Sequence, residues 1–481
     1  MFPHPRRIFL AFVFASLAGC TVGPDYQHPE PFSPLPEAFK EKGPWKKPVP
    51  RDHLPKDEWW KIYNDPALSR LLSAVTKASP TIYAALARLD QARALAGMEA
   101  SAFSPGISGS ASAERARQSP AKNRPAITVN SFSFAFDLRY ELDLWGRVRR
   151  LDEAAVARVA ASGADFHNVL LSVQAETARA YFQLRTLDAE RAVVLRNIDG
   201  RARSLDFIKR RRELGASDRL DLSLAETELA TAEGDLLEID RLRAARRHEL
   251  AVLCGTNPST FSIDENAIAA RTAPPPIPVG IPSELLERRP DVASAERALA
   301  ATCADIGVAS AAFYPSIVIF GAAGYGSFDV ERVLDWSSRQ WSLGPALNVP
   351  IFDGGRNIAN LRRAEALHAE ALARYRQQVL VAFQEVETCL SDLQLLAGRS
   401  VKLEQAVASG NRASLLMNER YKHGAVAYKD VADTERLAIA NERLAVQVLG
   451  QQLVTSVLLV KAVGGGWASE APFDGTGQDA P

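Results

Sequence analysis

Residues 132–145, FSFAFDLRYELDLW, alternate strictly between apolar and polar positions. Successive side chains of a strand point to opposite faces of the sheet, so this pattern predicts a strand with one apolar face and one charged face. The charged face carries Asp137, Arg139, Glu141 and Asp143. The apolar face carries Phe132, Phe134, Phe136, Leu138, Tyr140, Leu142 and Leu144.

The chain is similar to itself at a shift of about 210 residues, which indicates an internal duplication. ASAFSPGI (100–107) aligns with SAAFYPSI (310–317). After a deletion of one residue, Gly215-Ala216 aligns with Gly424-Ala425, and the strand at 132–144 aligns with WSLGPALNVPIF (341–352). Both copies therefore contain the same order of predicted elements.

Long helices are predicted in two windows that contain no proline, between Pro125 and Pro258 and between Pro350 and Pro472. A helix interior excludes proline at a cost of about 3 kcal/mol. Glycines at 215 and 424 interrupt the helical pattern and predict turns between paired helices, and TAPPPIPVGIP (272–282) predicts a linker between the copies. The run 217–253 predicts a helix of about 55 Å. Its heptad seam consists of Leu222, Leu229 and Leu236, and each leucine is followed three positions later by a smaller or branched residue, Ala225, Ala232 or Ile239.

Four strands per chain are expected, at 106–116, 132–144, 316–328 and 341–352. Segments of about ten residues with alternating polarity are typical of outer-membrane strands. A sheet in lipid must close on itself, and four strands are too few to close around side chains, so several copies of the chain must contribute. The apolar face of 132–144 would meet lipid or packed neighbours, and the charged face a wet interior or the rim. The alternative is a soluble, half-buried sheet.

The N-terminus has the pattern of an export signal. Arg6 and Arg7 precede an apolar run at 8–18, which is too short to span a bilayer. The run ends in Leu17-Ala18-Gly19-Cys20, which resembles a bacterial lipobox. We therefore expect a signal peptide at 1–19 and a mature lipoprotein whose Cys20 carries acyl chains such as palmitate. Thr21 follows in place of an inner-membrane retention Asp, which favours the outer membrane. The alternative is an ordinary signal peptide that contains a cysteine.

Composition argues against several other classes of protein. Lys+Arg and Asp+Glu both number 57, so no net charge indicates a nucleic-acid partner. No continuous apolar run of eighteen residues follows the signal. The seven His residues form no HxH or HExxH motif, and neither GxSxG nor GxxxxGK[ST] occurs, so we expect no enzyme activity, no metal and no cofactor. Cys254, Cys303 and Cys389 are expected to be buried structural thiols.

Several segments together resemble one known family. The lipidated start CTVGPDY (20–26), the segment DEWWKIYNDPALSRLL (57–72), YELDLWGRVR (140–149) and PIFDGGR (350–356) are similar to the outer-membrane factors of tripartite efflux pumps. The strongest signature is GIPSELLERRPDVASAERALAATCADIGVASAAFYPSI (280–317), and GGGW (464–467) completes the pattern. The chain resembles the TolC-like family, and within it the NodT-like lipoproteins.

This resemblance implies a fold and a function. The fold would be mainly α, internally duplicated, with long coiled-coil-like helices in a periplasmic α-barrel of twelve helices. Three chains would contribute four strands each to a twelve-stranded membrane β-barrel. The homotrimer would be a passive exit duct for small molecules, as in multidrug resistance, and would dock a periplasmic adaptor (membrane fusion) protein and an inner-membrane transporter. The alternative is a lipid-anchored periplasmic coiled-coil scaffold without a pore.

The resemblance also suggests a division of the chain into domains. A lipid-anchored N-terminal segment would cover 20–75, and the two efflux repeats 76–271 and 272–467. A C-terminal tail would cover 468–481. The compound exported and the class of transporter do not follow from the sequence.

The resemblance further implies two kinds of functional site, both at the turns between long helices. Asp433 matches a pore-lining aspartate of the family, and Arg420 and Tyr421 match residues near it; the alternative for Asp433 is an ordinary solvated acid on a helix. VAYKD (426–430) is more charged here than is common in the family, which bears on the choice of adaptor. The adaptor-docking hairpin ends would be Gly215, Ala216, Ser217, Gly424, Ala425 and Val426.

Overall fold

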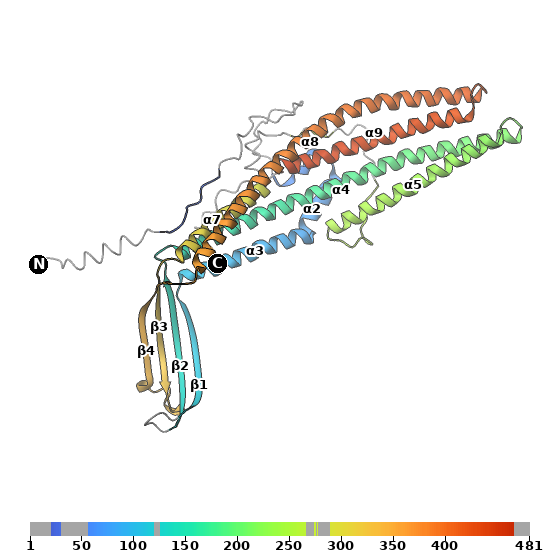
Figure 1. Cartoon of the computed structure of the whole chain (residues 1–481). Helices are drawn as coiled ribbons and strands as arrows, with labels where there is room; N and C mark the ends of the chain where they lie inside the picture. The colour runs from blue at the N-terminus through green and yellow to red at the C-terminus, as the bar shows by residue number, and fades with distance from the viewer. Residues whose placement is uncertain are drawn as a thin grey trace. The chain divides into compact units, whose positions relative to one another are not determined.

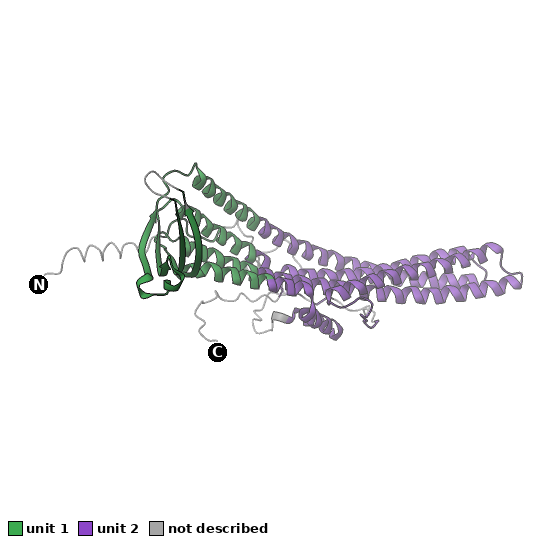
Figure 2. Ribbon diagram, turned by 90° about the horizontal axis from the view of Figure 1, so that it is seen from below, with its two compact units in different colours: residues 1–30, 88–163, 294–376 green, residues 31–87, 164–293, 377–481 purple. Residues whose placement is uncertain are grey.

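The computed structural model describes residues 21–29, 56–119, 126–265, 274–275, 277 and 289–465. Cys20, most of the predicted linker and the predicted tail lie outside these residues. The described chain forms two compact units, shown in Figure 2. One contains residues 1–30, 88–163 and 294–376, and the other contains 31–87, 164–293 and 377–481. Each unit takes segments from both sequence repeats.

The order of elements is the same in the two repeats (Figure 1). A helix leads into a strand hairpin, and a helical hairpin follows. The first repeat contains α3 (Pro80–Ala100), β1 (Gly106–Gln118), β2 (Ile127–Leu142), α4 (Arg147–Glu213) and α5 (Arg219–Leu253). The second contains α7 (Pro290–Ala311), β3 (Ser316–Ser327), β4 (Arg339–Asn348), α8 (Arg356–Lys422) and α9 (Tyr428–Ala462). The helix α2 (Pro66–Ala78) and the 3-10 helix η1 (Lys56–Tyr63) precede the first repeat.

The helix lengths confirm the duplication. The helices α4 and α8 both have 67 residues, and α5 and α9 both have 35. Two independent pairs of equal length are hard to obtain without a common origin. Each long helix also begins shortly after an aspartate, although the two aspartates are one position apart when the repeats are aligned. Asp143 accepts the N–H groups of Val148 and Arg149, and Asp353 accepts those of Gly355 and Asn357. A carboxylate at this end satisfies N–H groups that have no partner in the helix.

The four strands form one antiparallel sheet in the order β1-β2-β3-β4 (Figure 1). Its register aligns the apolar positions of all four strands. Phe134 lies between Ala111 of β1 and Tyr325 of β3, and Leu138 lies between Ile107 and Gly321. Residues paired across strands share a face, so the even positions of β2 are part of an apolar face that crosses the whole sheet. On β4 this face carries Trp341, Leu343, Pro345 and Leu347.

The opposite face of the sheet is more polar. Ser112 and Ser133 exchange a hydrogen bond of 2.8 Å, and Ser110 donates to Asp137 at 3.2 Å. The sheet is therefore two-faced, as the alternation at 132–144 predicts. Both edges, β1 and β4, have no partner strand within the described chain.

The observed strand ends differ from the predicted ones. The strand β2 ends at Leu142, so Leu144 and Asp143 lie beyond it, and Asp143 caps α4 instead of lining the charged face. The strand β4 ends at Asn348, before Pro350, which has no N–H to donate to a ladder. In both places the chain leaves the sheet to begin a long helix.

The helix α9 is the only described helix long and apolar enough to cross a membrane, with a mean hydropathy of 1.4 over its best window. This was not expected, because the sequence contains no continuous run of eighteen apolar residues. Half of that window is buried inside the chain, which is typical of a core helix. Gly450 explains part of that burial: a Cβ there would lie 2.1 Å from the Thr186 hydroxyl of α4, so α9 and α4 pack closely at this point.

The heptad seam of α5 is buried on one side only. Ala225, Ala232 and Ile239 are at most 3% exposed. The three leucines of the seam, at 222, 229 and 236, are only half-buried within one chain. Two charged residues, Glu228 and Arg243, are buried on α5 together with Ala225, Ala232 and Ile239. The interior that α5 faces is therefore partly polar, which the heptad pattern did not predict.

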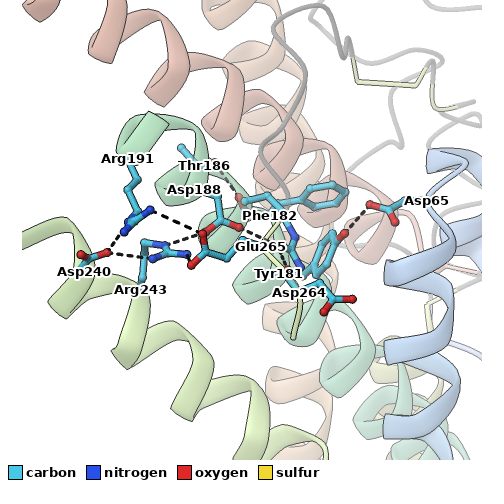
Figure 3. A network of polar contacts seen from close by, with 11 residues as sticks. Asp65, Tyr181, Phe182, Thr186, Asp188, Arg191, Asp240, Arg243, Asp264 and Glu265 are labelled. Atoms are coloured by element: carbon cyan, nitrogen blue, oxygen red, sulfur yellow. Dashed lines mark hydrogen bonds and ion pairs between the residues drawn. The ribbon is translucent and has the colours of Figure 1, made fainter. Parts of the chain in front are cut away.

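A network of charged side chains is buried where α4 and α5 pack together (Figure 3). The Arg243 guanidinium donates to Asp188 at 2.8 Å and to Asp240 at 2.9 Å, and lies 2.7 Å from Glu265. The Arg243 and Asp188 side chains are 3% and 4% exposed. Charges this deeply buried are tolerated only when they are paired. The network thus fastens α4, α5 and the chain after α5 to one another.

A second polar contact fastens α2 to α4 (Figure 3). Asp65 accepts the N–H groups of Ala67 and Leu68 and so caps α2. The other oxygen of this carboxylate accepts the Tyr181 hydroxyl of α4 at 2.7 Å. The ring of Tyr181 is fully buried, and the Arg185 guanidinium stacks on it at 4.8 Å. These contacts place α2 on the apolar core that includes Leu68, Leu72, Leu250, Leu453 and Val457.

The Arg243 network makes the helical unit sensitive to acid. Burial opposes ionisation of Asp240, but hydrogen bonds from Arg243 and Arg191 outweigh it and lower the pKa of that carboxyl. The hydrogen bond from Arg243 likewise lowers the pKa of Glu265. Because both carboxyl pKa values are lower when folded, this stabilisation is present above the ordinary carboxyl pKa. It is lost as the pH falls through the lowered values.

We expect Arg243→Leu to reduce the free energy of unfolding by about 3 kcal/mol, because Asp188 then loses a partner at a buried position. The midpoint of denaturant unfolding, followed by circular dichroism, measures the change. Arg241→Leu is the matched control, since Arg241 lies on the same helix, is exposed and pairs only with Glu238 among described residues. That control should leave the free energy of unfolding close to the wild-type value, because an exposed ion pair contributes little to stability. Equal midpoints for the two variants would contradict this account.

Candidate functional site

Both helical hairpins end in the same backbone turn. At the first, the N–H of Gly215 donates to Arg212 and that of Ala216 to Arg211, at 2.9 and 2.8 Å. At the second, the N–H of Gly424 donates to Tyr421 and that of Ala425 to Arg420, both at 2.9 Å. Both glycines have a φ in the left-handed region, +73° and +74°. This is the turn that ends a helix at glycine, and it explains why glycine occurs at both positions.

A shorter helix follows each turn, α5 in the first hairpin and α9 in the second. In the first hairpin, Asp218 caps α5 by accepting the N–H of Asp221 at 2.8 Å. In the second, the residue at the same position is Ala427, which has no side-chain oxygen. Asp430 instead accepts the Ala427 N–H at 3.3 Å. The two hairpin ends thus have one backbone shape and different side-chain chemistry.

Tyr421 lies in an aromatic cluster between the two hairpins. Its ring is 7% exposed and packs 5.6 Å from Tyr428, across the turn on α9. Phe207 of α4 lies 6.4 Å away, and the Arg211 guanidinium, also from α4, lies 5.3 Å over the Tyr421 ring. Tyr421 therefore joins the second hairpin to the first within one chain. The cluster includes Leu205, Ile208, Ala225, Val431 and Ala432.

Burial shifts the ionisation of both tyrosines. It raises the pKa of Tyr428 to about 12, and the nearby carboxylates of Glu435 and Glu228 add to the rise. Burial also raises the pKa of Tyr421, again with help from a carboxylate, that of Asp221. Both phenols stay neutral at physiological pH, so the cluster is held by ring packing and by the Arg211 guanidinium over the Tyr421 ring.

Asp433 is a solvated carboxylate on the returning helix. It lies on α9, its side chain is 52% exposed, and it forms an ion pair of 3.3 Å with Arg436 on the same helix. Arg436 is shared, because it also donates to Glu228 of α5 at 2.6 Å. Asp433 is thereby linked to a contact that joins two helices.

Two ion pairs one heptad apart connect α5 to α9. Arg436 pairs with Glu228, and Arg443 pairs with Asp235 at 2.9 Å. Glu228 is buried and also pairs with Arg201 of α4 at 2.9 Å. The two returning helices are therefore joined by partly exposed ion pairs one heptad apart, and only the Glu228 end is buried.

The structure brings some of the predicted site residues together and not others. Tyr421 and Asp433 both contact groups that link the two hairpins. Arg420 is exposed at the end of α8, and no ion pair is recorded for its side chain among the described residues. Ser217 donates to Asp221 at 3.1 Å and belongs to the cap of α5.

Sequence reasoning missed several residues near this site. Tyr428, Phe207 and Arg211 complete the aromatic cluster, and Arg436 and Glu228 form the ion pair beside Asp433. One signal could have found the ion pairs. Glu228 and Arg436 are 208 residues apart, and so are Asp235 and Arg443. That separation is close to the repeat shift, so equivalent faces of α5 and α9 must meet.

The described residues contain no group of three or more His, Cys, Asp or Glu side chains placed to hold a metal ion. Cys254 and Cys389 are buried, and burial raises their thiol pKa values to about 11 and about 12. Both thiols are thus protonated at neutral pH. Neither has the lowered pKa that a nucleophilic cysteine requires.

A two-faced sheet joined to long helical hairpins defines a class of protein, the outer-membrane channels with a helical extension. The profile of the family described as "Outer membrane efflux protein" matches residues 71–256 and 281–465. The chain belongs to this family.

Known proteins give the same result over the full length. The chain is 31% identical to outer membrane protein OprJ of Pseudomonas aeruginosa, over 94% of each chain. It is 30% identical to the solvent efflux pump outer membrane protein SrpC of Pseudomonas putida, over 95% of this chain and 97% of that one. The solved structure of the outer-membrane channel OprN superposes with a TM-score of 0.85 at 30% identity, covering 93% of this chain and all of that one.

These findings confirm the expected fold and role. The chain is a mainly helical, internally duplicated outer-membrane efflux protein, and its described residues form four strands. It is the outer-membrane channel, or exit duct, of an efflux system. Because SrpC covers nearly the same span with little change in length, the whole chain and not one domain of it carries this relationship.

Proposed function

We propose that three copies of this chain form one pore, with a membrane barrel of twelve strands continued by a periplasmic barrel of twelve helices. The observation that carries the proposal is the sheet, which has a continuous apolar face, a polar face and two open edges. In hydrocarbon each unpaired backbone group costs several kcal/mol, so β1 and β4 must find partners. The β4 of one copy and the β1 of the next supply them. The apolar face, which on β2 consists of the even-numbered residues from Phe132 to Leu142, then contacts lipid.

The same arrangement accounts for the half-buried leucines of α5. In one chain, residues 222, 229 and 236 are covered on one side only. In a trimeric helical barrel each hairpin has a neighbour from another copy, and that neighbour covers the exposed side. The duct is passive, and selection of the exported compound lies with an inner-membrane transporter and its periplasmic adaptor. The adaptor docks at the hairpin ends, around Gly215-Ala216-Ser217 and Gly424-Ala425-Val426.

The trimer gives a direct prediction. The detergent-purified protein should have the mass of three chains in native mass spectrometry and should conduct ions in a planar bilayer. A folded monomer without conductance would favour the alternative of a lipid-anchored scaffold without a pore. Trimers without conductance would support the assembly and contradict the duct.

We also propose that Cys20 is the lipid anchor and that 20–75 precedes two efflux repeats at 76–271 and 272–467. The residues after Cys20 support the anchor, because they are held where strands meet helices. The Val22 N–H donates to Trp145 at 3.0 Å, and Arg150 pairs with Asp25 at 2.7 Å. Trp145 stacks on Tyr314 at 4.9 Å. Paired Trp and Tyr rings are typical of the level where a membrane protein enters water, which is where acyl chains insert.

The anchor is tested by the intact mass of the mature protein purified from membranes. We expect a chain that begins at Cys20 and carries the additional mass of the acyl chains. Cys20→Ser should leave the signal uncleaved at that position and give an unmodified polypeptide mass. A wild-type protein with a free Cys20 would contradict lipidation.

For the pore constriction we propose that Asp433 lines the periplasmic end and that Tyr421 holds the hairpins closed. Three copies of Asp433 near one axis would attract cations, since like charges there repel unless they are compensated. The link of Asp433, through Arg436, to the Glu228 contact between α9 and α5 supports this role, whereas its exposure is shared with the alternative of an ordinary solvated acid. The buried ring of Tyr421, which packs on α4, supports a role in holding the hairpins closed. Arg420 is exposed, so a contact by which it helps to close the pore would be with another copy of the chain.

Bilayer recordings separate these roles. Asp433→Ala should weaken cation selectivity, and Arg420→Ala with Tyr421→Ala should raise the resting conductance. Tyr421→Ala alone should give most of that rise, because its ring fills the cluster, and Arg420→Ala alone should give little. Wild-type conductance and selectivity in all of these variants would show that the constriction lies elsewhere.

A further inference from the structure

The two hairpin ends have the same backbone turn but use their charges differently. Residues 209–219 of the first end contain five cations and two anions, an excess of three positive charges. The equivalent residues 418–428 of the second contain two cations and one anion. At two equivalent positions the chemistry changes entirely, because Arg212 corresponds to Tyr421 and Arg219 corresponds to Tyr428. Both tyrosines are buried inside the chain, and both arginines are exposed.

Only some of the positive side chains at the first hairpin end interact with other groups of the chain. Arg210 pairs with Asp206 at 2.7 Å, and Arg211 donates to the Ala216 carbonyl while it covers Tyr421. The remaining three are exposed, and the described residues provide no ion pair for any of them. These three are Lys209, Arg212 and Arg219.

Apolar side chains lie among these charges. Leu214, just before the turn, is 82% exposed, and Leu220, just after it, is 64% exposed. Neither contributes to the cluster around Tyr421. Two exposed leucines lie among these unpaired cations and the exposed anions Glu213 and Asp218, so the surface is apolar in the centre and has an excess of positive charge at the rim. Protein interfaces have this composition, with an apolar centre and a charged rim that selects the partner.

We propose that the first hairpin end is a cationic docking surface for an acidic partner, namely a periplasmic helical hairpin whose end carries an apolar residue bordered by Asp or Glu. This rests on the proposed docking of an adaptor and adds the chemistry of the adaptor segment. The second hairpin end contributes mainly to closure, because its aromatic residues are already packed on α4. Opposite charges at the rim would steer the encounter and fix which partner is accepted.

Photo-crosslinking separates this inference from the docking proposal. The photoreactive residue p-benzoylphenylalanine would replace Ala216 at the first end in the host cell, and the crosslinked peptide would be sequenced. A periplasmic segment with net negative charge supports the acidic partner. A periplasmic segment that is neutral or basic overturns the acidic partner and leaves docking intact. If neither this replacement nor the same replacement of Ala425 at the second end gives a crosslink, docking itself is overturned.

A binding measurement then tests the charges. The probe is a designed helical hairpin peptide with a leucine at its turn bordered by glutamates, compared with the same peptide bearing glutamines. The full-length channel in nanodiscs should bind the glutamate probe about tenfold faster at low salt, and this preference should fade as salt screens the charges. Equal rates for the two probes would overturn the proposal.

Two triple variants, matched in charge, locate the effect. Lys209→Gln with Arg212→Gln and Arg219→Gln should abolish the preference for the glutamate probe. Arg399→Gln with Lys402→Gln and Arg412→Gln removes the same charge from exposed positions of α8 and should leave the preference unchanged. An equal loss of this preference in both triple variants would show that the overall positive charge of the protein attracts the glutamate probe, and that these three positions form no docking surface. Preferential binding of the wild type to anionic lipid vesicles, with none to the peptide, would assign the surface to membrane and overturn the proposal.

Discussion

Unpaired backbone groups at a sheet edge are the constraint on which this structure depends. One chain supplies four strands whose register aligns Ile107, Phe134, Tyr325 and Trp341 along a single apolar face. Such a face is stable against lipid, but no strand among the described residues pairs with the outer edges of β1 and β4, and lipid offers no hydrogen bonds to them. The number of strands per copy therefore dictates assembly, and the helices must follow the symmetry that the sheet imposes.

The helical hairpins meet a different requirement, which is to stay in register over a long packed interior. Small residues such as Ala225, Ala232 and Gly450 let the helices approach closely, but small apolar contacts specify register poorly. Buried ion pairs specify it better, because a shift by one residue would leave a charge unpaired at several kcal/mol. The Arg243–Asp188 pair and the Arg201–Glu228 pair have this property.

Duplication gives the two hairpin ends one backbone turn and different side chains. The turns at Gly215 and Gly424 have the same hydrogen bonds and nearly equal φ. At two equivalent positions the first end has the exposed cations Arg212 and Arg219, and the second has the buried rings of Tyr421 and Tyr428. One backbone turn therefore supports an exposed, charged end in one copy and a packed, aromatic end in the other.

The sequence by itself determined the elements and their order. Alternation at 132–144 predicted a two-faced strand, the proline-free windows predicted the long helices, and the repeat predicted the equal hairpins, because each is a local pattern or a comparison of the chain with itself. Only the tertiary structure decided which side chains meet. The burial of Glu228 and Arg243 and the packing of Tyr421 on Phe207 depend on contacts between distant segments. Periodicity assigns a residue to a face of its helix, but it does not say what that face touches.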